Sequence, residues 1–336
     1  MQKILLTFLV TLAAYIFLDG NRSTVTVTST IQPQASPTNV QTDQPAPELG
    51  SDANPLILAL APSPHPTDEM ITAGESLVSQ LEELSGYHIV TVIPASETDV
   101  VRALSINNAH IVVLTPLAYL QARWEGTAHA KLASLRNGQV LYGAQFIARS
   151  DMGFTTYFDM TRGENTADAA EALAQFNNKK PCWSDTASSS AYVIPLGYLN
   201  QAQVQIRSPA FLEGQGPVVR AVYADGICDF GATYIDARQL PTLEADYPDV
   251  MEKVDVIWRI PPIIPYEIVS FASSLPPEMH RVLLRAFVDL MGTEDGKSAM
   301  QLVYGIDTMQ PTEDSLYDHF ETYVEASGLN LDPLPE

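Results

Sequence analysis

The distribution of apolar residues predicts alternating strands and helices in the first part of the chain. Residues 55–61 read PLILALA, and a continuous apolar run of this length is typical of a strand buried in a parallel sheet. Residues 70–85 carry apolar side chains at helical spacing and stop at Gly86, which predicts a helix ending there. The two patterns then alternate, with a strand at 88–93, a helix at 97–107 and a strand at 110–114.

A second series of the same kind follows from about residue 140. It predicts strands at 139–149, 180–183 and 226–233, and helices at 166–176, 189–201 and 218–225. A strand at 253–258, a proline-rich crossover RIPPIIPYEIVSF with a strand at its end, a helix at 275–289 and further helix up to Gly328 complete the chain. We predict an α/β fold with two lobes, each a mostly parallel sheet flanked by helices. Residues 55–145 and 255–336 form lobe 1, and residues 146–254 form lobe 2.

The N-terminal segment indicates export. Residues 4–18 form a 15-residue apolar run broken only by threonines, which is short for a membrane span and suits a signal peptide. Because no clean cleavage site follows, residues 1–19 are either a signal peptide or an uncleaved anchor. Residues 20–54 are rich in Ser, Thr, Pro and Gln, which predicts a disordered tether outside the fold. We expect the protein at the periplasmic or extracellular face of the membrane, and anchored to it if residues 1–19 are not cleaved.

The net charge of the chain limits the classes of partner that it can bind. Lys plus Arg number 18 against 40 Asp plus Glu, a formal net charge of −22. This balance argues against nucleic acid and against an anionic membrane surface, so membrane contact is expected only through the N-terminal segment. An anion bound by this protein must be held by local dipoles and hydroxyl groups.

Cys182 and Cys228 are the only cysteines. In an exported chain they can form one disulfide, or they can be two small buried apolar residues. A metal site is not expected, because no histidines accompany them. We also expect no cofactor.

Three adjacent serines, Ser188, Ser189 and Ser190, precede a predicted helix in the stretch KKPCWSDTASSSAYVIPLGYL. Serine is a poor residue inside a helix, because its hydroxyl competes for backbone hydrogen bonds. At a helix N-terminus, unpaired N–H groups and the positive end of the helix dipole favour an anion, and hydroxyls add donors. The serines are therefore candidates for an oxyanion cradle. The alternative is one helix cap followed by two solvated side chains.

Other candidate ligands lie in the loops expected where predicted strands end, among them residues 115–119, since ligands of open α/β sheets bind at the carboxyl ends of strands. They are Thr115, Tyr119, Tyr234, Tyr266 and Glu267. The tyrosines could instead pack under a sheet, and the glutamate could be an ordinary surface acid. No nucleophile, phosphate-loop, zinc or dinucleotide motif is present, so no catalytic residues and no enzyme activity are expected.

The ordered series of segments resembles a known family over about residues 55 to 330. The segments are LALAPSPHP, SETDVVRAL, HIVVLTPLAYLQAR, SDTASSSAYVIP, GICDFGATYIDA and IPPIIPYEIVSFASSLPPEMHRVLLRAFVDL. In this order they resemble the periplasmic substrate-binding proteins of phosphonate, phosphite and phosphate-type ABC transporters. The resemblance implies a type II two-lobed clamshell that closes over a small oxyanion. It also implies a monomer that delivers its ligand to an ABC transporter permease.

The resemblance also assigns roles to the candidate residues. It implies that Ser188, Ser189 and Ser190 grip the phosphonate oxygens, that Tyr119 with Thr115 faces them, and that Glu267 meets a ligand amine. The stretch EGQGPVV departs from the family, because Gly216 stands where a ligand-contacting histidine is often found. The ligand's identity therefore stays open. A membrane-tethered sensory module of the same fold is an alternative, and a hydrolase is a weaker one.

Overall fold

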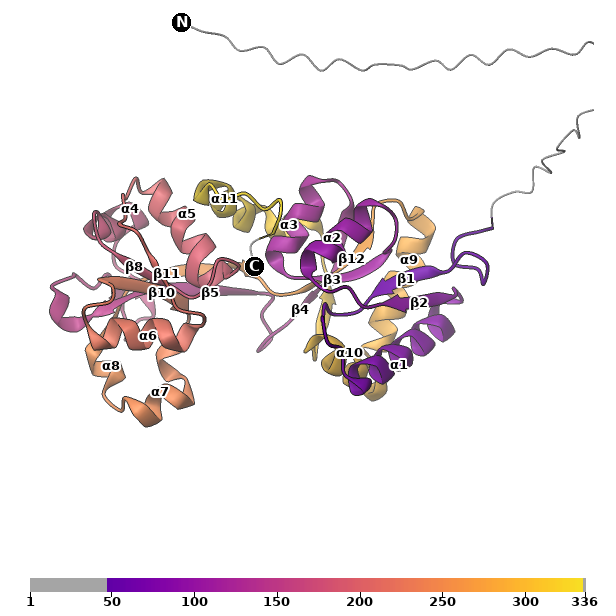
Figure 1. Ribbon diagram of the computed structural model, residues 1–336, viewed down its shortest axis with the longest axis horizontal. Helices are drawn as coiled ribbons and strands as arrows, with labels where there is room; N and C mark the ends of the chain where they lie inside the picture. The colour runs from indigo at the N-terminus through magenta and orange to yellow at the C-terminus, as the bar shows by residue number, and fades with distance from the viewer. Residues whose placement is uncertain (1–46, 335–336) are drawn as a thin grey trace, which may run out of the picture. The chain divides into compact units, whose positions relative to one another are not determined.

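Two β-sheets organise residues 47–334, the part of the chain that the computed structural model describes (Figure 1). The predicted signal or anchor at 1–19 and the tether up to residue 46 lie outside these residues. Within residues 47–334 no helix has the length and apolar character needed to cross a membrane.

The first sheet is six-stranded in the order β13-β4-β12-β3-β1-β2. Its strands are β1 (Leu56–Ala59), β2 (Ile89–Val92), β3 (Ile111–Leu114), β4 (Ala128–Ser134), β12 (Ile268–Ala272) and β13 (Met309–Pro311). Its helices are α1 (Asp68–Ser85), α2 (Glu97–Ser105), α3 (Pro116–Trp124), α9 (Pro277–Leu290) and α10 (Glu294–Tyr304). The predicted α/β alternation of the first half is therefore confirmed.

The second sheet is five-stranded in the order β11-β5-β10-β8-β9. Its strands are β5 (Leu141–Arg149), β8 (Pro181–Trp183), β9 (Ala210–Phe211), β10 (Phe230–Tyr234) and β11 (Val254–Pro265), and the pair β6 (Phe158–Asp159) and β7 (Glu164–Asn165) forms a small hairpin. The helices that accompany it are α4 (Ala169–Leu173), α5 (Ile194–Gln201), α6 (Gln215–Ala224), α7 (Pro241–Asp246), α8 (Val250–Lys253) and α11 (Asp318–Ser327).

Both sheets are mixed rather than mostly parallel. Strands β2, β1 and β3 are parallel to one another, as are β9, β8 and β10. In contrast, β12 is antiparallel to β3 and β4, and β5 is antiparallel to β10 and β11. A helical crossover imposes the parallel direction, whereas a strand that arrives from the other sheet is free of that constraint.

Strand β11 runs through the segment expected to be a crossover. It continues from Val254 to Pro265 and pairs with β5 at the edge of the second sheet. Its register shifts between Ile260 and Ile264, and this interval contains Pro261 and Pro262. Proline has no N–H for the ladder and is tolerated at an edge or a bulge, which explains how the strand accommodates both.

The fold also begins earlier than the predicted tether allows. Leu49 packs against the hydrophobic core. Gly50 donates its N–H to the carbonyl of Asn54 at 2.7 Å and accepts at 2.7 Å from the N–H of His88, which precedes β2. These backbone bonds hold residues 49–54 against the first sheet.

Two short segments connect the sheets and are bonded to each other. Residues 135–140 lead from β4 to β5, and residues 266–267 lead from β11 to β12. The N–H of Ser134 donates to the carbonyl of Glu267 at 3.0 Å, and the N–H of Tyr266 donates to the carbonyl of Val140 at 3.3 Å. The connections therefore run side by side where the chain passes from one sheet to the other.

The C-terminal helix α11 contacts helices of both sheets. Tyr323 stacks on Tyr198 of α5, with ring centroids 3.8 Å apart. A side chain at Gly197 of α5 would bring its Cβ to 2.1 Å from the carbonyl oxygen of Tyr323, so the close approach requires glycine. On the other side, Arg123 of α3 pairs with Asp318 at 2.9 Å.

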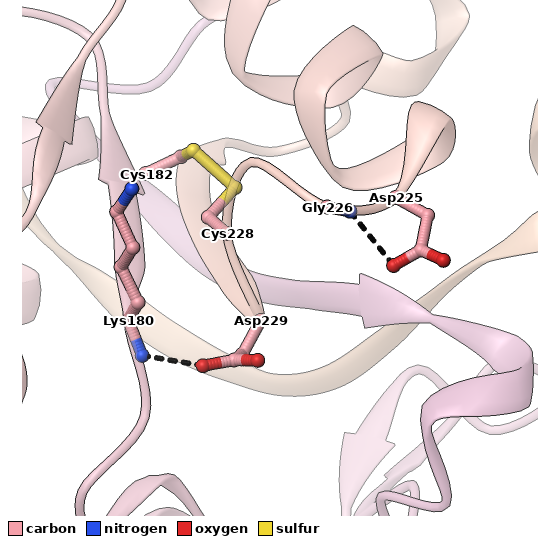
Figure 2. The surroundings of a disulfide bond; sticks show 6 residues. All are labelled: Lys180, Cys182, Asp225, Gly226, Cys228 and Asp229. Atoms are coloured by element: carbon pink, nitrogen blue, oxygen red, sulfur yellow. Dashed lines mark hydrogen bonds between the residues drawn. A yellow bond between two sulfur atoms is a disulfide. The ribbon is translucent and has the colours of Figure 1, made fainter.

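The two cysteines form a disulfide within the second sheet (Figure 2). Cys182 lies on β8, and Cys228 lies just before β10, its parallel neighbour. Beside the bond, the N–H of Lys180 donates to the carboxylate of Asp229 at 2.7 Å (Figure 2). Of the two interpretations left open by the sequence, the disulfide is therefore the one that the structure contains.

His110 is a buried polar residue that holds two strands together. It is 6% exposed, and its Nδ1 accepts a hydrogen bond from the N–H of Ile57 on β1 at 3.0 Å. A ring nitrogen that accepts must be unprotonated, so the bond requires neutral histidine. Burial lowers the pKa of His110.

Removing the disulfide should destabilise the protein. The bond joins residues 46 positions apart, and in the chain-entropy model closing such a loop contributes about 4 kcal/mol. We expect the variant Cys182→Ala/Cys228→Ala to have a free energy of unfolding lower by about 2–4 kcal/mol, as measured by urea denaturation. Reductant should reproduce the loss in the native chain and leave the variant unchanged. Equal stability of the two proteins would contradict this prediction.

Lowering the pH should reduce the free energy of unfolding, because the buried His110 must stay unprotonated in the folded protein. Because its pKa is lower in the folded state, the unfolded chain takes up a proton first as pH falls below the ordinary value of 6.5. Its contribution to the free energy of unfolding is thus complete above pH 6.5 and decreases below it. His110→Gln, which keeps an acceptor but does not titrate, should have lower stability at neutral pH and a shallower loss between about pH 6.5 and 5. Parallel urea denaturation series test this, and equal slopes would contradict it.

Candidate functional site

A pocket of ≈ 490 Å³ lies where segments of both sheets and their connections meet. From the first sheet it is lined by Thr115 and Pro116, from the connections and their ends by Arg136, Asn137, Pro265, Tyr266 and Glu267, and from the second sheet by Tyr142, Ala187, Ser188, Ser189, Ser190, Gln215, Tyr234 and Ile235. A hollow of ≈ 450 Å³ between α1 and α10 is lined by three carboxylates, with no lysine or arginine among its described lining residues. That hollow does not suit an anion.

The three serines begin a helical segment at the wall of the pocket. Ser188 has an extended backbone and caps the turn Ser189–Val193, which continues into α5. The turn is a wide π-type turn, and Pro195 just beyond it has no N–H to donate back. Ser189 and Ser190 occupy the first positions, where backbone N–H groups have no acceptor within the helix. The wall therefore combines helix-start N–H groups with serine side chains.

The hydroxyl of Ser188 has both of its acceptor sites occupied. Its Oγ accepts from the N–H of Ala191 at 3.1 Å and from Nε2 of Gln215 at 3.4 Å. Since a hydroxyl has two acceptor lone pairs and one donor proton, the O–H of Ser188 remains as a donor. The same Gln215 accepts from the N–H of Tyr234 at 3.1 Å through its Oε1. Gln215 thus ties the serine turn to the end of β10.

Tyr142 lines the pocket together with the serine turn. Burial raises the pKa of Tyr142 far above its ordinary range, against a smaller lowering by the side chain of Ser190, so the hydroxyl stays neutral. Its ring stacks on Tyr266, with centroids 4.7 Å apart and an interplanar angle of 22°. Two aromatic rings therefore form one side of the pocket.

Glu267 is already paired with a cation. Nη2 of Arg136 lies 2.9 Å and 3.0 Å from its two carboxylate oxygens, and Oγ of Ser134 donates to Oε2 at 3.2 Å. The guanidinium of Arg136 also lies over the ring of Tyr266, 5.1 Å from its centroid. The acid expected to meet a ligand amine is thus neutralised within the protein.

Thr115 lines the pocket, but its hydroxyl proton is used elsewhere. Oγ1 of Thr115 donates to Oε2 of Glu97 at 2.6 Å, and its N–H donates to Oε1 of the same carboxylate at 3.4 Å. Burial raises the pKa of Glu97, while these two bonds lower it. Because a hydroxyl has a single proton, Thr115 cannot donate to an oxyanion while this bond is present.

Tyr119 is not at the pocket. The segment after β3, expected to be a loop, is the helix α3, and Tyr119 lies one turn beyond its start. The side chain is fully buried, its ring is tilted against Tyr317 at 4.2 Å between centroids, and its hydroxyl donates to Asp314. The carboxylate of Asp314 also accepts from the N–H of Ala130 at 2.7 Å. Tyr119 therefore anchors the C-terminal segment instead of facing a ligand.

The structure thus brings together seven of the sequence-based candidates and adds others. Ser188, Ser189, Ser190, Thr115, Tyr234, Tyr266 and Glu267 line the pocket with Arg136, Tyr142 and Gln215, which sequence reasoning missed. Gly216, placed by the resemblance at the histidine position, is not among the lining residues, whereas its neighbour Gln215 is. The signal that could have identified Gln215 is its place directly before Gly216, the position where the resemblance puts a ligand-contacting histidine. Among residues 47–334, no three His, Cys, Asp or Glu side chains gather as they would around a metal ion.

Solved structures of similar fold cover most of this chain. XAC2383 from Xanthomonas citri, bound to ATP, has 14% sequence identity and a TM-score of 0.61, covering 81% of this chain and 96% of its own. PhnD1 from Prochlorococcus marinus in complex with methylphosphonate has 14% identity and a TM-score of 0.52, covering 81% and 98%. PA3383 from Pseudomonas aeruginosa, a binding protein component of an ABC phosphonate transporter, has 15% identity and a TM-score of 0.51, covering 82% and 87%. These likenesses establish the expected type II periplasmic-binding-protein fold.

The sequence itself also identifies the family. No curated protein matches the chain. The family model described as "ABC transporter, phosphonate, periplasmic substrate-binding protein" matches residues 60–317, more than half of its length. Membership implies an extracytoplasmic location and a solute-binding role in transport, in a family that is typically non-enzymatic. The chain therefore belongs to the family of periplasmic substrate-binding proteins of phosphonate ABC transporters.

Proposed function

We propose that this protein binds a phosphonate or a related small oxyanion in the pocket lined by Ser188, Ser189 and Ser190. The observation that carries the proposal is the hydrogen bonding of Ser188. Its Oγ accepts two hydrogen bonds within the protein, so its proton remains free to donate to a ligand. Family membership supports the same ligand class, as does the solved Prochlorococcus marinus protein in complex with methylphosphonate.

The chemistry of the serine turn suits a tetrahedral anion. Such a group carries several acceptor oxygens around one centre, and the turn offers hydroxyl and backbone donors from consecutive residues. Neutral donors at a helix start stabilise negative charge through the helix dipole, which matters in a chain whose formal net charge is −22. Tyr142, Tyr234 and Tyr266 supply further hydroxyl groups at the same pocket.

The proposed mechanism is closure of two lobes about the paired connections. Each lobe is built on one sheet, and residues 135–140 and 266–267 form the hinge. A ligand that bonds to both lobes favours the closed state by its difference in affinity for the two states. A difference of about 5.5 kcal/mol would change the population from almost all open to almost all closed. The closed, loaded monomer would then deliver the ligand to an ABC transporter permease.

Export completes the proposal. Residues 1–19 serve as a signal peptide or as an N-terminal anchor, and residues 20–46 connect them to the fold.

A thermal-shift screen with methylphosphonate, phosphite, phosphate and sulfate tests the ligand class, because a ligand that binds only the native state raises the melting temperature of the protein as its concentration increases. Sugars and organic cations are run beside them, and a rise with these alone would overturn the proposed ligand class.

Replacing the hydroxyl of Ser188 should weaken oxyanion binding. A hydrogen bond to a charged group contributes about 1.5–3 kcal/mol, so Ser188→Ala should raise the dissociation constant for methylphosphonate by about tenfold or more in calorimetry. Ser188→Thr, which keeps a hydroxyl that can both cap the helix and donate to the ligand, should restore much of the affinity.

Tyr119→Phe provides the matched control, because it removes a hydroxyl near the first sheet but outside the pocket. It should leave the dissociation constant unchanged and lower the free energy of unfolding by about 1 kcal/mol, since Asp314 loses a donor. Native affinity in Ser188→Ala, or loss of affinity in Tyr119→Phe, would contradict the assignment of the site.

A further inference from the structure

We propose that Arg136 selects ligands in which the oxyanion is followed by a second negative group, such as a carboxylate. The inference rests on the proposed function, because it assumes that the serine turn holds the first oxyanion. It concerns the part of the ligand that extends toward the connections between the sheets.

The pocket is larger than a single oxyanion needs. Its volume is ≈ 490 Å³, whereas one water molecule takes up about 30 Å³ of liquid volume and a tetrahedral oxyanion only a few times as much. Arg136, Tyr266 and Glu267 line the same pocket as the serines. A ligand that fills the pocket therefore has further atoms beyond the group at the serines.

Two opposite charges line the pocket. Of the described residues at the pocket, Arg136 is the single lysine or arginine, and Glu267 is the single acid. A third charge, the carboxylate of Glu97, lies behind Thr115 and is close enough that Glu267 contributes to raising its pKa. The selectivity of the site depends on which partner of the ion pair can bond to a ligand group.

Glu267 is the more firmly held of the two. Besides Arg136, its carboxylate accepts from Oγ of Ser134 at 3.2 Å, and its carbonyl accepts from the N–H of Ser134 at 3.0 Å. Its side chain is 27% exposed. Three of the roughly four acceptor sites of the carboxylate are occupied and its charge is balanced by Arg136, so a ligand amine would gain little there.

Arg136 has donors to spare. Both of its bonds to Glu267 come from Nη2, and no hydrogen bond from Nε or Nη1 is present among the described residues. The side chain is 52% exposed on the turn between β4 and β5. Because a guanidinium presents five N–H donors in a planar fork, Arg136 can bind an incoming carboxylate and keep its bond to Glu267. The ion pair therefore favours a second anion over an amine, which reverses the role that the resemblance gave to Glu267.

Three ligands that share one phosphonate and differ in the distal group test this selectivity. They are methylphosphonate, 3-phosphonopropionate and 2-aminoethylphosphonate, titrated calorimetrically against the full chain at pH 7.5 and low salt. We expect 3-phosphonopropionate to bind on the order of tenfold more tightly than methylphosphonate. We expect 2-aminoethylphosphonate to bind no more tightly than methylphosphonate.

Arg136→Gln should abolish the preference for 3-phosphonopropionate over methylphosphonate, measured as the ratio of the two dissociation constants in the same variant. It should also improve binding of 2-aminoethylphosphonate, because Glu267 loses its cation. Arg162→Gln makes the same change of charge at an arginine that pairs with Asp159 outside the pocket, and it should retain the native order of affinities. Circular dichroism confirms that both variants are folded.

The inference is overturned if the native protein does not prefer 3-phosphonopropionate, if it prefers the amine, or if the preference persists in Arg136→Gln. Loss of the preference in Arg162→Gln as well would make it a general charge effect and would also overturn the inference. If the native protein binds none of the three ligands, the proposed phosphonate function fails and this inference fails with it. Binding of methylphosphonate without discrimination refutes the role of Arg136 alone.

Discussion

The hydrogen bonds that fix the start of the helical turn at Ser188 determine what this pocket can hold. Gln215 spans from the Ser188 hydroxyl to the backbone of Tyr234, so one amide positions the serine turn against the end of β10. A strongly acidic chain can bind an anion only where donors are oriented in advance, because its overall field opposes binding. Orientation by fixed neutral groups replaces the attraction that a basic protein would supply.

The fold was largely predictable because its parallel strands are buried on both faces and read as apolar runs. Residues 55–61 and 110–114 are such runs, and both became strands. The antiparallel strands were harder to place, since β11 contains prolines at an edge bulge. The helix α3 was missed because Thr115-Pro116 looks like a loop, although proline suits the first turn of a helix.

The site was predictable only as far as local sequence determines it. The three serines could be found because a serine cluster before a helix has a local meaning. Gln215 and Arg136 could not be found in this way, because their roles come from partners that are distant in sequence, at Tyr234 and Glu267. The prediction for Tyr119 was wrong for the opposite reason. Its neighbours in sequence lie at the pocket, but its own side chain is buried in the core. The structural likeness to solved proteins shows the fold, but at 14–15% sequence identity it does not identify the ligand, which depends on these side chains.

The last helix has a consequence for how the molecule can move. Helix α11 is held to α5 by the stacked rings of Tyr323 and Tyr198 and by the close approach at Gly197. The residues just before it are held to the first sheet, because Tyr317 packs on the buried ring of Tyr119, and Asp314 accepts from Tyr119 and from the N–H of Ala130 on β4. The C-terminal segment is therefore a third link between the two sheets, made by packing instead of by chain connection. Any rotation of one sheet against the other has to bend this segment between residues 314 and 323 or break one of its contacts.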